Sequence, residues 1–150
     1  ESLVCLVGSE MCIRDRAIGT RGREGTAIGA LFAIGNIQKM RGHSTAMVLN
    51  PFKGHSVAKR DVKNKENHET LAEFAWLDGA ILFNRDGIAS DAGRYILVPA
   101  GLTPKSGEGG RHLAARAVSQ LTEGIGIAVS STGSIVLYAN GRERYRVRLK

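Results

Sequence analysis

Short apolar runs alternate with two helical segments along the chain, and this alternation most constrains its fold. The runs that are typical of buried strands span residues 28–34, 44–49, 80–83, 95–98 and 125–130. Leu71, Phe74 and Ala75 recur at helical spacing, and a second helix is predicted over residues 111–122. Strands interleaved with helices predict an α/β fold with a central mixed β-sheet flanked by helices. The strongly polar segment 57–67 is expected to be exposed.

The last part of the chain is predicted to form a β-hairpin. Asn140-Gly141, the strongest short hairpin signal, separates residues 134–139 from residues 143–149. The period of two along the second strand predicts one face that carries Arg142, Arg144, Arg146, Arg148 and Lys150. This row of basic residues fits a solvated strand face or a guarded sheet edge. A nucleic-acid-binding module is a further alternative, but aromatic residues make up only 5% of the chain, which argues against a base-stacking surface.

The start of the chain does not fit the rest of it. Residues 1–16 resemble the conceptual translation of a transposase sequencing adaptor, and the chain begins at Glu1 rather than at a methionine. A short apolar first strand or a trimmed signal peptide are the alternatives, but a signal peptide needs a basic start and a longer apolar run. We therefore expect residues 1–16 to be non-native and residues 17–150 to form one domain, with truncation at its N-terminus left open.

Cysteine usage and charge narrow the class of protein. Cys5 and Cys12 are the only cysteines and both fall in residues 1–16, so the remainder has no disulfide framework and no thiolate metal site. A cytoplasmic protein is the simpler interpretation. The longest apolar run, residues 27–35, is too short to span a membrane, so no membrane partner is expected. The net charge of +7 indicates an anionic ligand or partner, without choosing between ATP, nucleic acid and an acidic surface.

Two short signals carry the chemistry. Asp78 stands between the first helix and the apolar run 80–83, where a carboxylate can hold a divalent metal or orient a hydroxyl group, or simply end the helix. The glycine-rich segment 107–110 leads into Arg111 and His112 at the start of the second helix. Free backbone N–H groups and the helix dipole attract phosphate there, and an arginine grips phosphate through two parallel hydrogen bonds. The alternative is a flexible loop with a solvated arginine.

Hydroxyl groups follow the predicted strand at residues 125–129. Ser130, Ser131 and Thr132 suit hydrogen bonding to phosphate or ribose, and they equally suit a plain turn. The chain contains no Walker A sequence, so a P-loop fold is not expected. His43, His55 and His68 lack the spacing of metal ligands and are predicted to be surface residues.

Taken in order, the short motifs resemble the diadenylate cyclase (DAC) domain, the nucleotide-binding domain of the DNA integrity scanning protein, in its archaeal-like branch. The matching segments are Gly29-Ala-Leu-Phe-Ala-Ile-Gly35, Asn50-Pro-Phe-Lys-Gly54, Leu77-Asp-Gly-Ala-Ile81, Ala92-Gly-Arg-Tyr-Ile96, Gly110-Arg-His112 and Ser130. The resemblance implies a nucleotidyltransferase that condenses two ATP molecules into the second messenger cyclic di-AMP and two pyrophosphates. It also implies Mg²⁺ or Mn²⁺ and a homodimer or higher oligomer with facing active sites.

The same resemblance implies roles for particular residues. Asp78 is the expected catalytic residue, and Asp78 and His112 are the expected metal ligands. The residues expected to bind nucleotide are Gly79, Ala80, Ile96, Gly110, Arg111, His112, Ser130, Ser131 and Thr132.

Three positions depart from the family pattern. Leu113 stands where an arginine is usual, Gly110 where a threonine is common, and Ser131 where an acidic residue is common. Arg116, one helical turn beyond His112, is a candidate substitute for the missing arginine. An alternative to the cyclase is therefore a degenerate homologue that binds ATP or cyclic di-AMP as a sensor without efficient turnover.

Overall fold

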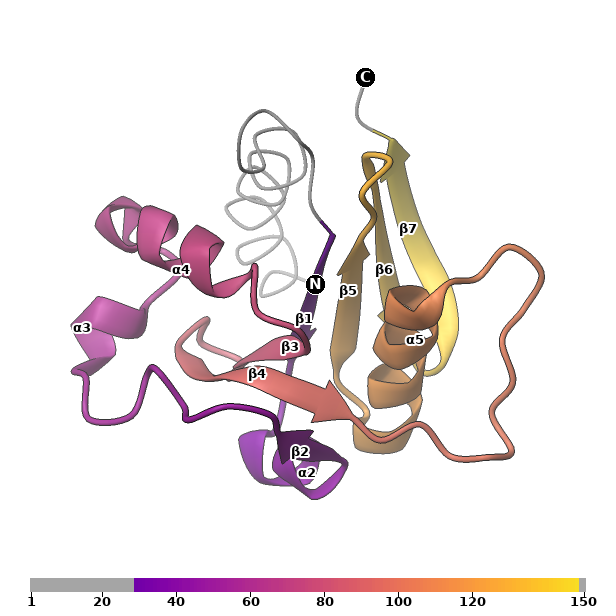
Figure 1. The fold of residues 1–150 in the computed structure, drawn as a ribbon, viewed down its shortest axis with the longest axis horizontal. Coiled ribbons are helices and arrows are strands. Elements are labelled where there is room, and N and C mark those ends of the chain that lie inside the picture. Colours follow the sequence, from indigo (N-terminus) through magenta and orange to yellow (C-terminus); the bar gives the residue numbers. More distant parts are fainter. Residues whose placement is uncertain (1–28, 149–150) are drawn as a thin grey trace.

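The fold is built on one mixed β-sheet (Figure 1). The structure is a computed structural model that describes residues 29–148, so the predictions for residues 1–16 and 17–28 lie outside the described residues. Between residues 29 and 148 the sheet has seven strands in the order β2-β4-β3-β1-β5-β6-β7. Their bounds are β1 Ala30–Ile34, β2 Ser44–Ala46, β3 Ala80–Phe83, β4 Ala89–Ile96, β5 Ile125–Val129, β6 Ser134–Ala139 and β7 Arg142–Arg148. Because β1 and β3 are parallel and the other pairs are antiparallel, the predicted mixed α/β sheet is confirmed.

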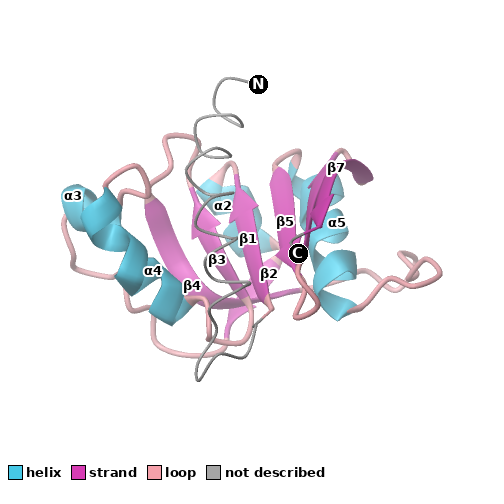
Figure 2. Ribbon diagram, turned by 90° about the horizontal axis from the view of Figure 1, so that it is seen from above, coloured by secondary structure: helices cyan, strands magenta, loops and turns pink. Residues whose placement is uncertain are grey.

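Helices cover both faces of the sheet (Figure 2). Their bounds are α2 Ile37–Gly42, α3 Val57–Arg60, the 3₁₀ helix η2 Lys65–Asn67, α4 His68–Phe74 and α5 Gly110–Thr122. On one face, α5 and α2 contribute Ala115, Val118 and Met40 to a core with Leu31 and Leu82. On the other face, Leu71 of α4 packs in a core that contains Phe32 and Phe83. None of the helices in this part of the chain is both long and apolar enough to cross a membrane.

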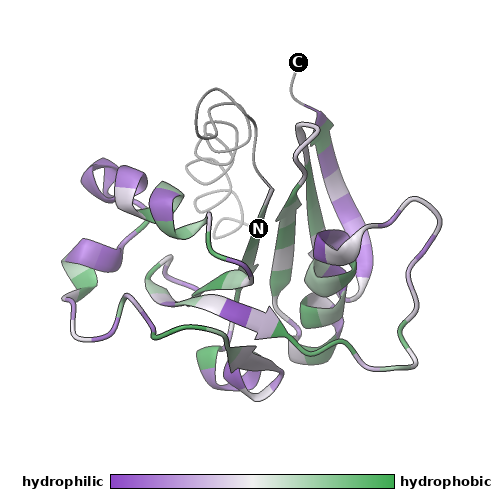
Figure 3. Cartoon of the chain, viewed as in Figure 1, coloured by the Kyte–Doolittle hydropathy of each residue, from purple (hydrophilic) through white to green (hydrophobic). Residues whose placement is uncertain are grey.

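The centre of the sheet follows directly from the apolar pattern. All five residues of β1 and all four of β3 are buried, as expected for strands that are covered on both faces. In Figure 3 these central strands are hydrophobic, whereas β7 at the sheet edge is largely hydrophilic. The predicted strand over residues 80–83 and the predicted helix over residues 111–122 are confirmed to within one residue.

The strand β4 was not predicted correctly, since the apolar pattern favoured residues 95–98. Its interior contains Asp91, which is buried, and a hydrophobic pattern does not identify such a strand. The carboxylate is satisfied by side chains from three segments: Ser90 Oγ donates to it at 2.6 Å, Arg41 forms an ion pair at 2.9 Å, and Asn50 Nδ2 lies at 3.5 Å. These hydrogen bonds allow a charged residue to sit inside the sheet.

Segment 57–67 is also different from its prediction. Val62 and Asn67 are buried, although the segment was expected to be exposed throughout. Asn67 Nδ2 donates to the carbonyl oxygens of Ala58 and Asp61, at 2.8 and 2.9 Å, so the polar side chain satisfies the backbone at the end of a short helix. The predicted strand at residues 44–49 is short, because β2 ends at Ala46.

A β-bulge in β7 overturns the predicted row of basic residues. Leu137 pairs with Tyr145, but the next residue, Tyr138, pairs with Glu143, so Arg144 is an extra residue in the ladder. The alternation of faces therefore changes phase at Arg144. Arg146 and Arg148 lie on the α5 face of the sheet together with Glu143, whereas Arg142 lies on the other face; Leu149 and Lys150 lie outside the described residues.

Replacing Asp91 by alanine tests the polar network inside β4. Asp91→Ala leaves Arg41 and Ser90 without their acceptor, and we expect it to lower the free energy of unfolding by roughly 2 kcal/mol. Asp86→Ala is the matched control, because Asp86 is exposed in the turn after β3, and it should change the free energy of unfolding by less than about 0.5 kcal/mol. Urea unfolding of both variants measures the difference, and equal effects would contradict this view of β4.

Candidate functional site

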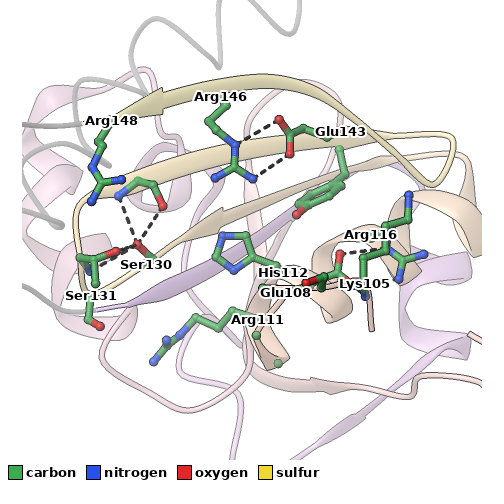
Figure 4. A pocket seen from close by; sticks show the side chains of 17 residues that line it. Lys105, Glu108, Arg111, His112, Arg116, Ser130, Ser131, Glu143, Arg146 and Arg148 are labelled. Carbon is green, nitrogen blue, oxygen red and sulfur yellow. Dashed lines mark hydrogen bonds and ion pairs between the residues drawn. The ribbon is translucent and has the colours of Figure 1, made fainter. Parts of the chain in front are cut away.

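A cavity of about 540 Å³ lies between the N-terminal end of α5 and the ends of β5, β6 and β7 (Figure 4). This volume is within the range of small-molecule sites. Six of the residues predicted to bind nucleotide line it, namely Gly110, Arg111, His112, Ser130, Ser131 and Thr132. The structure thus brings the glycine-rich loop and the hydroxyl-rich turn into one concave site.

The first turn of α5 presents unsatisfied backbone donors to the cavity. Gly109 is the N-cap residue and has no side chain to cap the helix. The first intrahelical bond in this region is from Leu113 N to Gly109 O, at 3.0 Å. The N–H groups of Gly110, Arg111 and His112 precede it and have no acceptor within the helix, as at the start of any α-helix. They are available to an anion, which the helix dipole also favours.

A buried ion pair fastens the glycine-rich loop to α5. Arg116 Nε and Nη2 donate to the two carboxylate oxygens of Glu108 at 2.9 and 2.8 Å, and Nη2 also donates to Thr103 O at 2.7 Å. Both side chains are only 7% exposed. The hydrogen bonds from Arg116 lower the pKa of Glu108, so the carboxyl group stays ionised. The hypothesis that Arg116 replaces the missing arginine stays a prediction, but the charge of its guanidinium group is already balanced by Glu108.

The position of Arg111 depends on Gly29, which precedes β1. A Cβ atom at Gly29 would lie 2.1 Å from Arg111 Cζ and 2.3 Å from Nη1, so the guanidinium group occupies the space where a side chain would be. Arg111 is exposed and forms no hydrogen bond or ion pair with the described side chains. It is a free cation at the edge of the sheet.

The hydroxyl groups after β5 form a closed turn. Ser130 Oγ accepts from Ser134 N at 3.1 Å and from Thr132 N at 3.3 Å, and it lies 2.9 Å from Ser134 Oγ. Ser130 thus shapes the turn, while Ser131 and Thr132 are exposed beside the cavity. The interpretation of this segment as a turn is confirmed, and hydrogen bonding of its hydroxyl groups to phosphate or ribose stays a prediction.

The floor of the cavity contains His112 and Tyr138, whose ring centroids lie 6.4 Å apart with an interplanar angle of 80°. Burial, followed by the positive charges of Arg146 and Arg111, lowers the pKa of His112 below its ordinary value of 6.5. Burial raises the pKa of Tyr138 to about 12. Both side chains are therefore neutral at pH 7 and act as hydrogen-bonding groups rather than as charges.

Strand β7 supplies a wall of the cavity that was not predicted from the sequence. Arg146 donates to both carboxylate oxygens of Glu143, at 2.7 and 3.1 Å, and Arg148 lies farther along the same strand (Figure 4). Lys105 adds a further positive charge from the loop before α5. The Asn140-Gly141 hairpin signal placed β7 beside β6, but the face that its arginines occupy depends on the bulge at Arg144.

Four of the predicted site residues do not line this cavity: Asp78, Gly79, Ala80 and Ile96. The register nevertheless places Asp78 and Ser130 at the same end of the central strands. Leu31 of β1 pairs with both Ala80 of β3 and Ala128 of β5, so Asp78 and Ser130 lie two strands apart, with Gly29 between them. Two strand spacings amount to roughly 10 Å. The guanidinium group of Arg111, which lies over Gly29, is thus between the carboxylate and the cavity.

The backbone at Gly79 explains the Asp-Gly-Ala sequence. Its φ is +93°, and an added Cβ would lie 2.6 Å from Arg94 O of β4, so only glycine fits between Asp78 and the strand. Ala80 and Ile96 are buried in the core under α5. Asp78 itself is exposed and has no hydrogen-bonding or ionic partner among the described side chains.

A metal ion would find few protein ligands here. Within residues 29–148, no three or more His, Cys, Asp or Glu side chains are arranged so that they could together hold a metal ion. The carboxylates of Glu108 and Glu143 are paired with arginines, which leaves Asp78 free. Mg²⁺ is commonly held by one or two carboxylates together with substrate phosphates, so this set of residues fits a metal that arrives with its phosphate ligand.

A second cavity, of about 600 Å³, lies beside α3 and α4, and Phe52 and Phe74 are among the residues that line it. Its most basic residue, Arg60, already donates to His55 O and Ala89 O, at 3.0 and 2.7 Å. None of the predicted site residues lines it.

Adding a methyl group at Gly29 tests the position of Arg111. We expect Gly29→Ala to displace the guanidinium group and to weaken binding of inorganic tripolyphosphate by about tenfold, equivalent to the loss of one charge-assisted hydrogen bond. Gly101→Ala is the control, because an added Cβ there meets open space. Isothermal titration calorimetry measures both affinities, and similar values for the two variants would contradict the role of Gly29.

The lowered pKa of His112 predicts how stability depends on pH. Because the folded chain resists protonation of this ring, its contribution to the free energy of unfolding is fully present above pH 6.5, the ordinary pKa. It is lost as the pH falls from there toward the lowered pKa of the folded state. The wild type should therefore lose more stability than His112→Gln between about pH 7 and about pH 5 in urea unfolding. Parallel pH profiles would show that His112 is not perturbed.

Comparison with known proteins places this arrangement in a family. The model of the family described as DisA bacterial checkpoint controller nucleotide-binding (DAC) matches residues 17–143. Two curated relatives are called diadenylate cyclase: the one from Methanocaldococcus jannaschii is 35% identical over 119 residues, and the one from Haloferax volcanii is 32% identical over 121 residues. Each match covers 79% of this chain but only 38% and 44% of the relatives, so the chain spans less than half of their length.

Solved structures support the same fold. A double mutant of DacA from Staphylococcus aureus superimposes with a TM-score of 0.64 at 20% identity, covering 93% of this chain and 84% of the other. A hypothetical membrane spanning protein from Bacillus cereus gives a TM-score of 0.68 at 18% identity, covering 95% of this chain and 64% of the other. At these identities the likeness concerns the fold alone. Because the family model matches residues 17–143, which are most of its length, the chain belongs to the DAC family of nucleotide-binding domains.

Proposed function

We propose that this chain is a diadenylate cyclase, a nucleotidyltransferase that condenses two ATP molecules into cyclic di-AMP and releases two pyrophosphates. The observation that carries the proposal is the placement of Arg111 between the cavity of about 540 Å³ and the free carboxylate of Asp78. ATP as substrate fits the cytoplasmic location expected from the sequence.

The cavity residues would bind the triphosphate. The free N–H groups at the start of α5 and the guanidinium group of Arg111 donate to phosphate oxygens, and Ser131 and Thr132 donate from the opposite turn. Neutral His112 donates one further hydrogen bond without adding charge. Phosphoryl transfer depends mainly on positioning and charge stabilisation, so a site with few reactive side chains is sufficient.

Asp78 would act on the ribose side of the nucleotide. Its carboxylate accepts a hydrogen bond from the attacking 3′-hydroxyl group and orients it, while Gly79, Ala80 and Ile96 shape the adjoining nucleotide pocket. Asp78 is also the residue that would hold Mg²⁺ or Mn²⁺, with His112 as a second candidate ligand. When bound, the metal neutralises phosphate charge and polarises the α-phosphate.

The reaction requires two copies of the domain, since each 3′-oxygen bonds to the α-phosphorus of the other ATP as the bond to pyrophosphate breaks. An exposed apolar surface supports such a pairing: Tyr95 and Leu97 are 54% and 47% exposed, and Met47 is 49% exposed. The pairing of Ala80 with Arg94 brings the strand that carries Tyr95 close to the start of β3, which Asp78 precedes. A homodimer or higher oligomer with facing sites is therefore the proposed active form, and neither membrane nor nucleic acid is a proposed partner.

A second candidate function is a sensor that binds ATP or cyclic di-AMP without efficient turnover. Leu113, which stands where the family usually has arginine, does not line the cavity, and the charge of Arg116 is already balanced by its ion pair with Glu108. A site with one phosphate-binding cation fewer would bind nucleotide but turn it over slowly.

Product analysis tests the proposal. The protein is incubated with ATP and Mn²⁺, and cyclic di-AMP is measured by mass spectrometry beside an Asp78→Ala control. We expect product from the wild type and a loss of at least about a hundredfold in the variant, the usual size of such a catalytic contribution. ATP binding without product would contradict the cyclase and favour the sensor. In that case Leu113→Arg is the next variant. If this variant forms cyclic di-AMP, the missing arginine at position 113 is the reason why the wild type does not.

A further inference from the structure

We propose that Arg148 is a further phosphate-binding residue, which closes the cavity opposite Arg111 and binds the terminal phosphates of the nucleotide. This inference rests on the proposed function and deepens it, because it assigns a second cation to the triphosphate from a part of the chain that the family motifs do not include.

Positive side chains outnumber carboxylates around the cavity. Five cationic side chains line it: Lys105, Arg111, Arg116, Arg146 and Arg148. Two of them are neutralised by bidentate pairs, Arg116 with Glu108 and Arg146 with Glu143. The side chains of the other three, Lys105, Arg111 and Arg148, make no hydrogen bond or ion pair with any side chain of residues 29–148. An anion entering the cavity therefore meets the ammonium group of Lys105 and these two guanidinium groups uncompensated.

The two unpaired arginines approach the same turn of the chain. Ser130 follows the end of β5, Ser134 begins β6, and Arg148 ends β7 directly opposite Ser134 in the register. Three consecutive strand ends thus meet at one edge of the sheet. Arg148 reaches toward Ser130 from β7, and Arg111 approaches the same turn from α5 (Figure 4). Because both side chains end beside the hydroxyl groups of this turn, one polyphosphate chain can contact both of them.

Arg148 points into the cavity because of the bulge in β7. In a regular strand, residues i and i+3 point to opposite faces, so Glu143 and Arg146 could not pair. Here they form an ion pair at 2.7 Å, because the bulge at Arg144 brings both onto the α5 face. The same change of phase carries Arg148, two residues beyond Arg146, onto that face. The bulge and its ion pair therefore direct Arg148 toward the ligand, and a bulge that aims a side chain in this way is common beside functional sites.

The ligand is identified by this chemistry. Two guanidinium groups on either side of a hydroxyl-rich turn and a helix N-terminus match a chain of phosphates rather than a single phosphate or a base. Arg148 thus adds a cation to the cavity from β7, whereas α5 carries Leu113 in place of an arginine. Arg148 stabilises the charge that accumulates on pyrophosphate as it leaves the α-phosphorus.

The test compares two arginines of the same strand. Arg148→Ala removes the cation that faces the cavity, and Arg142→Ala removes the same charge from the opposite face of β7. Calorimetric affinities of the whole chain are measured for ATP, inorganic tripolyphosphate and AMP. We expect Arg148→Ala to weaken ATP and tripolyphosphate by at least about tenfold and AMP by less than about twofold. Arg142→Ala should leave all three affinities within about twofold of the wild type.

Equal losses in the two variants would overturn the inference, because they would reflect only the net charge of the chain, and no loss in either variant would overturn it as well. Arg148→Lys guards against misfolding. It retains the charge but not the two-pronged geometry, so an intermediate affinity supports a specific phosphate contact.

Cyclase activity is measured separately. If the wild type forms no cyclic di-AMP but Arg148→Ala still weakens tripolyphosphate binding, the proposed reaction is disproved and the phosphate site is retained. If the wild type is active and Arg148→Ala equals it in every assay, the phosphate site alone is disproved.

Discussion

The ion pair between Glu108 and Arg116 is the interaction on which the rest of the site depends. It connects the loop before α5 to the second turn of that helix, and each side chain is only 7% exposed. Removing one partner of a buried pair typically costs about 3–5 kcal/mol, because the remaining charge is left in the interior. With this pair in place, the glycine-rich segment turns into α5 at a fixed point, so the free N–H groups of the first turn and the side chains of Arg111 and His112 face one cavity. Arg116 therefore positions the residues that we propose to bind phosphate.

The topology of the sheet joins this cavity to the Asp-Gly-Ala sequence. Because β1 lies between β3 and β5, the carboxylate of Asp78 and the turn at Ser130 end up at one edge of the sheet with Gly29 between them. The absence of a side chain at Gly29 allows Arg111 to lie across this edge. A nucleotide that extends from the cavity toward Asp78 would place its phosphates and its ribose at chemically suitable groups. Segments that are far apart in the sequence are thus brought to the same end of the strands.

Prediction from the sequence succeeded where burial alone determines the structure. The apolar runs of β1, β3 and β5 and the helical spacing of α5 are visible in the sequence, and the resemblance to the DAC domain identified six of the residues in the cavity. The strand β4 was misplaced because Asp91 is buried by hydrogen bonds to Ser90 and Arg41, which a hydrophobic pattern does not reveal. The wall formed by β7 was missed because the bulge at Arg144 changes the face of every later residue. Pairing of charges, as in Arg116 with Glu108, is equally invisible to composition. The catalytic role of Asp78 stays a prediction.

The most direct test of the account is a crystal structure of the protein with Mg²⁺ and an ATP analogue whose α- and β-phosphorus atoms are joined by a methylene group. We expect the three phosphates to lie between Arg111 and the turn at Ser130, with the terminal phosphate against Arg148 and the ribose toward Asp78. Phosphates bound in the second cavity, beside α3 and α4, or a nucleotide in the reverse direction with its base between Arg111 and Arg148, would contradict this arrangement.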